Sequence, residues 1–123
     1  MVLLLAVASL GLTVLLGATL AIVALRAPLQ KPPRVLATLH GVCATLGIVF
    51  LFLALREPTR GVATGTQSFG LVAAILLLLA ALIGIVSVVL HGRRTRFPGG
   101  IAGAHAFVAI SGYVILAVYL LLG

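Results

Sequence analysis

Two histidines are the residues of this sequence best suited to chemistry. His40 and His105 lie 65 residues apart, each inside a long apolar segment. Imidazole nitrogens bind transition metals, and iron that is already held by a porphyrin needs only two further, axial ligands. The first chemistry that these residues predict is therefore a b-type haem held between His40 and His105.

The surroundings of the two histidines repeat at the same spacing. Aligning the chain with itself at an offset of 65, without gaps, superimposes Pro33 on Pro98, Ala37 on Ala102, Ala44 on Ala109 and Gly47 on Gly112. We predict one transmembrane domain over 1–123, made of a two-helix unit that occurs twice, over 1–58 and over 66–123. Because each unit crosses the membrane twice, both copies keep one orientation, and the histidines lie at one depth.

Composition places the chain in a membrane. Apolar residues make up 63% of the chain and charged residues 7%, and the mean hydropathy is +1.41. Each of four apolar segments is close to or above the roughly 20 residues that a helix needs to span the hydrocarbon core. Polar and apolar positions do not alternate within these segments, which excludes a membrane β-barrel. We expect an all-α, integral membrane four-helix bundle built from two parallel two-helix repeats, with spans over 2–25, 35–55, 69–90 and 101–122.

The basic residues indicate the orientation of the bundle. Arg26, Lys31 and Arg34 lie between the first two spans, and Arg93, Arg94 and Arg96 lie between the last two, whereas only Arg56 and Arg60 flank the middle connection. The positive-inside rule then predicts four spans with both termini on the non-cytoplasmic side. The net charge of +7 is a topology signal and favours anionic lipids of the bilayer, so no nucleic-acid partner is expected.

Small residues share a helix face with each histidine. The face of His40 carries Ala37, Ala44 and Gly47, and the face of His105 carries Ala102, Ala109 and Gly112 at the same spacings of three, four and three. Small side chains leave room for a flat macrocycle, which makes all six candidate cofactor-binding residues. The alternative is close helix packing, with each histidine hydrogen-bonded to a neighbouring helix.

A bare metal ion fits the sequence less well than haem. Zinc takes four ligands, or three and a water, and the spans offer no Asp, Glu or second Cys beside the two histidines. Cys43 is interpreted as a small packing residue. An ionisable side chain within a span is a functional-site hypothesis by default. His40 and His105 are therefore the predicted metal ligands, and Arg34 and His91, at the cytoplasmic ends, are candidates for binding haem propionates.

The segments LHGVCATLG around His40 and AHAFVAISG around His105 carry a resemblance. In motif they resemble small bis-histidine b-type cytochrome membrane subunits, which are four-helix bundles. The resemblance implies that His40 and His105 are axial ligands in electron transfer with quinol or quinone, or in a membrane anchor for a soluble redox subunit. Familiar two-haem members carry four such histidines, whereas this chain has one in each of two helices.

Other functions remain open at this level. The alternative to a cytochrome is a non-redox accessory or assembly subunit of a larger membrane complex. Close-packing faces for a partner are available at Ser9, Thr13, Gly17 and Ala21, and at Ala80, Gly84 and Ser87. No acid or base accompanies a Ser, Thr or Cys, so an enzyme is the less favoured interpretation. Tyr113, with Ser111, is a candidate for contacting a quinone, and Tyr119 for an interfacial anchor.

Overall fold

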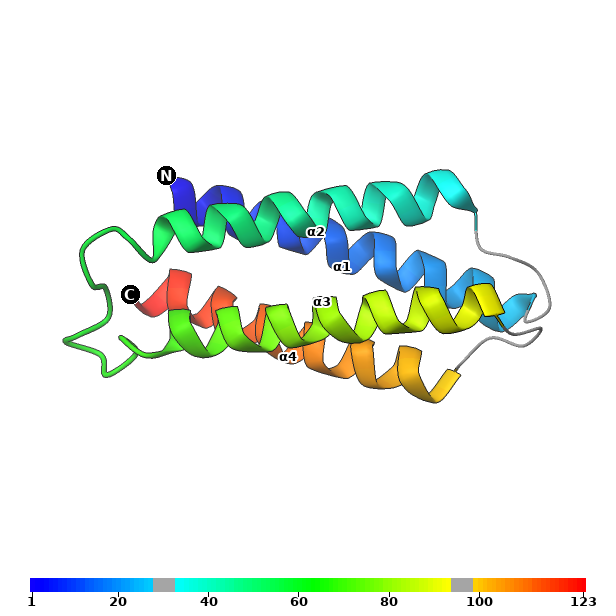
Figure 1. The fold of residues 1–123 in the computed structure, drawn as a ribbon. Helices are drawn as coiled ribbons and strands as arrows, with labels where there is room; N and C mark the ends of the chain where they lie inside the picture. The colour runs from blue at the N-terminus through cyan, green and yellow to red at the C-terminus, as the bar shows by residue number, and fades with distance from the viewer. Residues whose placement is uncertain (28–32, 94–98) are drawn as a thin grey trace.

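The chain folds into four long helices (Figure 1). The computed structural model describes residues 1–27, 33–93 and 99–123, except for the side chains of residues 91–93. Within these ranges the only regular secondary structure is helical, which confirms the predicted all-α class. All four helices are long and apolar enough to span a membrane. Their bounds are α1 Val2–Arg26, α2 Arg34–Ala54, α3 Phe69–Arg93 and α4 Gly99–Leu122.

Length and a proline explain the helix limits. α1 has 25 residues, and a rise of about 1.5 Å per residue gives it roughly 37 Å, enough to cross the hydrocarbon core with some tilt. α2 begins at Arg34, directly after Pro33, whose φ is −56°. Proline has no amide hydrogen to donate, and the start of a helix is where an amide lacks an intrahelical acceptor. Pro33 therefore occupies the N-cap position of α2.

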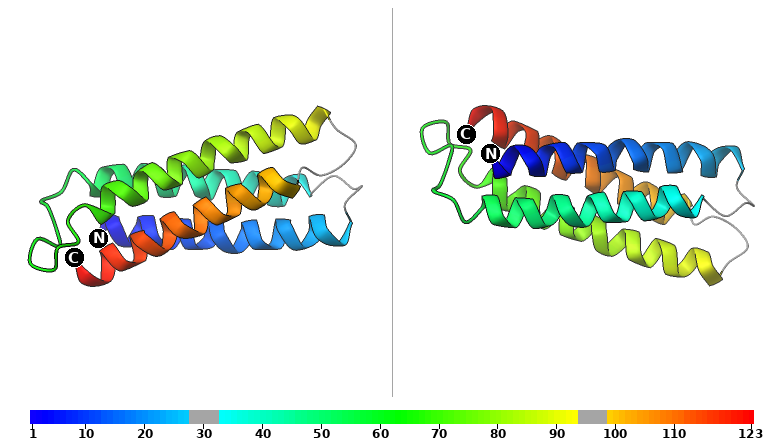
Figure 2. Two further views of the ribbon diagram at one scale, coloured as in Figure 1. Left: turned by 90° about the horizontal axis from the view of Figure 1, so that it is seen from below. Right: turned by 90° about the horizontal axis from the view of Figure 1, so that it is seen from above.

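Two helical hairpins make up the bundle. α1 packs mainly on α2, and α3 packs mainly on α4, with smaller interfaces joining α1 to α4 and α2 to α3. In the part of the chain that the structure describes, α2 and α4 lie on one diagonal of the bundle and α1 and α3 on the other. Both termini and the middle connection lie at one end, whereas α1 and α3 end, and α2 and α4 begin, at the opposite end (Figures 1 and 2). The integral membrane bundle of two parallel two-helix repeats is therefore confirmed.

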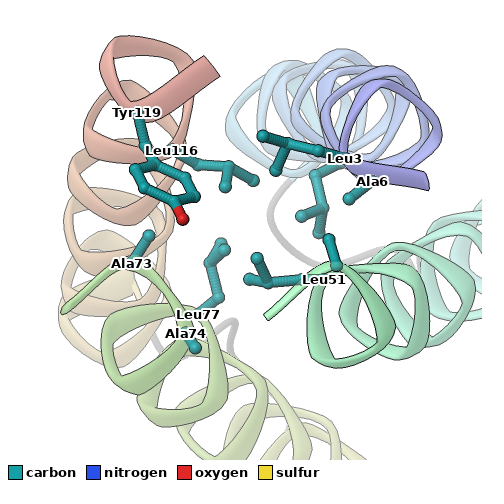
Figure 3. Packing of buried hydrophobic residues seen from close by; sticks show 10 residues of the cluster. Leu3, Ala6, Leu51, Ala73, Ala74, Leu77, Leu116 and Tyr119 are labelled. Atoms are coloured by element: carbon teal, nitrogen blue, oxygen red, sulfur yellow. The ribbon is translucent and has the colours of Figure 1, made fainter. Parts of the chain in front are cut away.

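The closely packed core occupies the end that holds the termini. Leu51 of α2 and Leu116 of α4 are completely buried and stand at equivalent positions of the two hairpins. Figure 3 shows side chains from all four helices converging there. The buried cluster consists of Leu3, Ala6, Leu10, Leu51, Ala54, Ala73, Ala74, Leu77, Leu116 and Tyr119.

The middle connection closes the same end of the bundle. The Thr64 hydroxyl donates a hydrogen bond of 2.9 Å to the carbonyl oxygen of Leu122 at the end of α4. Thr66, a residue of the same connection, is buried. Gly61 has a φ of +73°, a conformation that a residue with a side chain rarely adopts, which explains a glycine at this turn. The connection is therefore a structured cap over the core.

The two hairpins have equivalent packing, but the sequence offset that relates their first helices differs from the offset that relates their second helices. α2 and α4 correspond at an offset of 65, but the buried residues of α1 and α3 correspond at 67, as Ala6 does with Ala73 and Leu10 with Leu77. The contacts agree, because Leu10 packs on Gly47 and Leu77 packs on Gly112. The connection between α1 and α2 is two residues longer than that between α3 and α4, which accounts for the difference.

We predict that Leu51→Ala destabilises the bundle. The free energy of unfolding is expected to fall by about 1–3 kcal/mol. This is less than the largest losses in water-soluble proteins, because lipid solvates an unpacked leucine as well as the protein interior does. Unfolding by increasing dodecyl sulfate in mixed micelles measures the change. Leu53→Ala is the matched control, since Leu53 is 45% exposed. Equal effects of the two changes would contradict the packing described for this end.

Candidate functional site: a histidine pair between the hairpins

The two histidines meet across the interface between the hairpins. Their ring centroids are 6.1 Å apart, and the ring planes make an angle of 69°. His40 comes from α2 and His105 from α4, so the pair joins the two helices of one diagonal. Both side chains are half-buried. Helices of two separate repeats thus bring together the residues that the sequence singles out.

Each ring is held by a backbone carbonyl of its own hairpin. The Nδ1 atom of His40 lies 3.0 Å from the carbonyl oxygen of Thr13, and that of His105 lies 2.7 Å from the carbonyl oxygen of Ala80. A carbonyl oxygen only accepts, so each Nδ1 carries the proton and donates it. A neutral imidazole protonated at Nδ1 has an unprotonated Nε2 with a free lone pair. Both histidines are therefore fixed in the tautomer that binds a metal through Nε2.

A glycine lies against each ring. A Cβ atom added to Gly17 of α1 would lie 3.0 Å from Cε1 and 3.3 Å from Nδ1 of His40. A Cβ added to Gly84 of α3 would lie 3.0 Å from Cε1 and 3.1 Å from Nδ1 of His105. Both separations are shorter than ordinary van der Waals contact. The rings approach the carbonyls closely because these two positions lack side chains.

The carbonyl and the glycine form one motif that occurs twice. The accepting carbonyl stands four residues before the glycine, as Thr13 before Gly17 and Ala80 before Gly84. Residues four apart lie one above the other on a helix, so one bare stretch of backbone receives the whole edge of the ring. Each hairpin therefore positions its own histidine without help from the other.

Sequence reasoning identifies the small faces of α1 and α3 but misses this pairing. Gly17 and Gly84 are 67 residues apart, and an ungapped comparison at 65 places Gly17 opposite Leu82. A two-residue gap in the shorter connection, between α3 and α4, would have aligned the glycines. The signal was present in the sequence, in the unequal lengths of two connections.

Other hydroxyl groups of the spans bond within their own helices. Thr13, Thr45 and Ser111 each donate to the carbonyl four residues earlier. In the described ranges, the two histidines make the only side-chain hydrogen bonds that join one spanning helix to another. Hydrogen bonds between spanning helices are worth about 0.6–2 kcal/mol each. The polar contacts of the membrane interior are thus concentrated at the histidine pair.

The small residues predicted around the histidines divide into two groups. Ala37, Ala44, Ala102 and Ala109 are half-buried, one turn before or after a histidine. Gly47 and Gly112 are buried two turns after the histidines, toward the core. A leucine of the adjacent helix packs on each of them. These two glycines serve the hairpin interface and do not contact the rings.

Arg34 and His91, the candidates for binding haem propionates, lie at the end of the bundle opposite the termini, which we call the basic end. Arg34 is the first residue of α2 and is exposed, six residues before His40, which is about 9 Å along the helix. His91 lies in the last turn of α3, and its side chain is outside the described part of the structure. Arg34 thus lies at the end of the bundle that is nearer to the histidines.

On α2, α3 and α4, close packing ends at or before the level of the histidines. From the core toward the basic end, the last buried residue is Gly47 on α2, Ala80 on α3 and Gly112 on α4, among side chains that the structure describes. On α1, Thr13 and then Ala24 are the last buried residues. α1 and α3 diverge toward this end (Figure 2). The histidine pair therefore lies where the packed core gives way to a looser half of the bundle.

Neither further ligands among the described side chains nor a known relative indicates what the histidine pair binds. Within the described residues, no three His, Cys, Asp or Glu side chains lie close enough together to hold a metal ion. The sequence matches no known protein family, and no curated protein or solved structure is significantly similar to it. The function has to be inferred from the site itself.

Proposed function

We propose that the protein is a membrane electron-transfer protein, or the anchor of a redox complex, that binds one b-type haem between His40 and His105. The observation that carries the proposal is the fixed tautomer of the pair. Both Nδ1 atoms donate to backbone carbonyls, and both Nε2 atoms keep free lone pairs in the membrane interior.

The tautomers argue against a simple hydrogen bond between the rings. Two unprotonated Nε2 atoms are both acceptors, so neutral His40 and His105 have no proton to share. Adding a proton places a cation inside the span, which is expensive. A Lewis acid between the rings satisfies both lone pairs, and a carbonyl bonded to the second ring nitrogen is the usual support of a metal-binding histidine.

The distance between the rings fits two axial ligands of one metal. Metal–imidazole bonds of about 2 Å, with each centroid roughly 1 Å behind its nitrogen, place the centroids about 6 Å apart. The observed separation is 6.1 Å. Two ligands are too few for a bare zinc ion but complete the coordination of iron held by a porphyrin. The donor set therefore favours haem over a bare metal.

The remaining diagonal of the bundle suits the macrocycle. A macrocycle held between His40 and His105 would face α1 and α3, the helices of the other diagonal. These are the helices that carry Gly17 and Gly84 at the level of the rings and that diverge beyond it. The propionates would then point to the looser, basic end, where Arg34 and His91 are the candidate partners.

A bound haem would supply a one-electron redox centre, and the chain would fix its position. His40 and His105 would hold the iron, the carbonyls of Thr13 and Ala80 orient the rings, and the apolar bundle would exclude water. With the basic connections in the cytoplasm, both termini lie on the non-cytoplasmic side and the site lies nearer the cytoplasmic face. The partners would be the lipid bilayer and a redox subunit or a larger membrane complex, and a quinone is a candidate cofactor.

Titration of the haem-free protein with haemin tests the proposal. The detergent-solubilised chain is expected to bind one equivalent, with absorbance at the Soret band rising linearly to a sharp end point. Binding of zinc or copper ions at the histidines, without haemin, would instead indicate a bare metal site. Failure to bind either would favour the alternative, a non-redox accessory or assembly subunit of a larger membrane complex.

A further inference from the structure

The contacts between the two hairpins gather at one end of the bundle. The cluster of buried side chains to which all four helices contribute lies at the end that holds the termini. Two further contacts join the hairpins on the core side of the histidines. Tyr113 of α4 packs on Gly11 of α1, and Leu55, which follows α2, packs on Gly70 of α3. The hairpins are therefore held to each other mainly at this packed end.

The other half of the bundle has little to hold the hairpins together. Among the described side chains on the basic side of the histidines, only Ala24 is buried. The hydrogen bonds of His40 and His105 both stay within one hairpin, to the carbonyls of Thr13 and Ala80. α1 and α3 diverge toward the basic end (Figure 2). Because a region with few buried contacts opens at a low cost in free energy, the basic half is the half that can open.

The packed end offers no way in for a ligand of the histidine pair. Leu51 and Leu116 fill the bundle there and are completely buried. The middle connection closes this end, where the Thr64 hydroxyl donates a hydrogen bond to the carbonyl oxygen of Leu122. A macrocycle that binds between the histidine rings therefore has to enter from the basic half.

We propose that the packed end is a hinge, about which the two hairpins part at the basic end to admit the macrocycle and then close on it. The identity of the ligand rests on the proposed function, whereas the hinge rests on the packing alone. Each histidine is held by a carbonyl of its own hairpin, so each ring moves with its hairpin and keeps its Nε2 free. A ligand that binds both rings of the closed form shifts the hairpins toward that form.

Distances between nitroxide spin labels, measured by double electron–electron resonance in phosphatidylcholine nanodiscs, test the hinge. Ala21→Cys and Val88→Cys label α1 and α3 in the basic half. Leu4→Cys and Leu71→Cys label the same helices at the packed end and are the matched control. All four positions are exposed, and each pair occupies equivalent positions of the two hairpins. Cys43→Ala removes the native cysteine from both labelled proteins.

The two label pairs are expected to behave differently. In the haem-free protein, the distance distribution of the basic pair should be about twofold wider than that of the packed pair, because few buried contacts restrain the basic half. One equivalent of haemin should narrow the distribution of the basic pair and leave that of the packed pair unchanged.

The outcomes separate the hinge from the haem. Equal widths for the two label pairs in the haem-free protein would overturn the hinge. A Soret band that forms with haemin, while the distribution of the basic pair stays as wide as before, would overturn the closing of the hairpins on the ligand. A wider basic pair in a protein that binds no haemin would support the hinge and contradict the proposed haem.

Discussion

Replacing either His40 or His105 by alanine is expected to convert the proposed six-coordinate haem centre into a five-coordinate one. The remaining imidazole still binds iron, but one axial position is lost, so the ferric spectrum should change from low-spin to high-spin. Haem affinity should fall at least tenfold in each single variant. The double variant is expected to bind no haem specifically. Absorption and electron paramagnetic resonance spectra of the purified variants measure the change.

Cys43→Ala provides the control for these variants. Cys43 lies on α2, three residues after His40, and is half-buried. Its replacement should leave the low-spin spectrum unchanged. Each alanine at a histidine also removes one interhelical hydrogen bond, which is worth about 1 kcal/mol, so the haem-free bundle should remain folded. A low-spin spectrum that persists in both single variants would exclude His40 and His105 as axial ligands.

Gly17→Val and Gly84→Val are expected to abolish low-spin haem while both histidines remain. Any side chain at these positions begins 3.0 Å from a ring carbon and is directed at the ring edge that carries Nδ1. The ring must move away, the hydrogen bond to Thr13 or Ala80 breaks, and space beside the macrocycle is filled. Haem retained after detergent purification should drop at least tenfold relative to the unchanged protein.

Gly41→Val is the matched control for the glycine variants. Gly41 follows His40 directly, yet an added Cβ atom would meet nothing within 4 Å. Glycine is a poor residue for a helix interior, so this change should leave haem binding intact and slightly stabilise α2. If Gly17→Val and Gly41→Val behaved alike, the ring contacts would not control the site.

The fold was accessible from the sequence because its determinants are local. Four apolar segments of spanning length, separated by Pro33 and by a polar stretch with Gly61 and Gly65, leave little choice of helix limits. The predicted limits agree with the structure to within three residues at every end. Charge and hydropathy act over single segments, and a bilayer permits few other arrangements of them.

The site was only partly accessible because it depends on register between helices. The repeat predicts that His40 and His105 occupy equivalent depths, and the structure places their ring centroids 6.1 Å apart. The supporting groups of Thr13 and Ala80 are backbone carbonyls, which every residue has and which no sequence pattern distinguishes. Gly17 and Gly84 were recognised as small residues, but the unequal connections concealed their equivalence. The contact of each glycine with a histidine ring depends on how two helices pack, which the sequence of one helix alone does not determine.

The visible absorption spectrum of the purified protein, produced with adequate haem supply, tests the central claim most directly. The account predicts a sharp Soret band in the air-oxidised protein that shifts on reduction with dithionite, together with resolved alpha and beta bands of a bis-histidine haem. The pigment should be present at one haem per chain. A protein that stays colourless even after reconstitution with haemin would contradict the account.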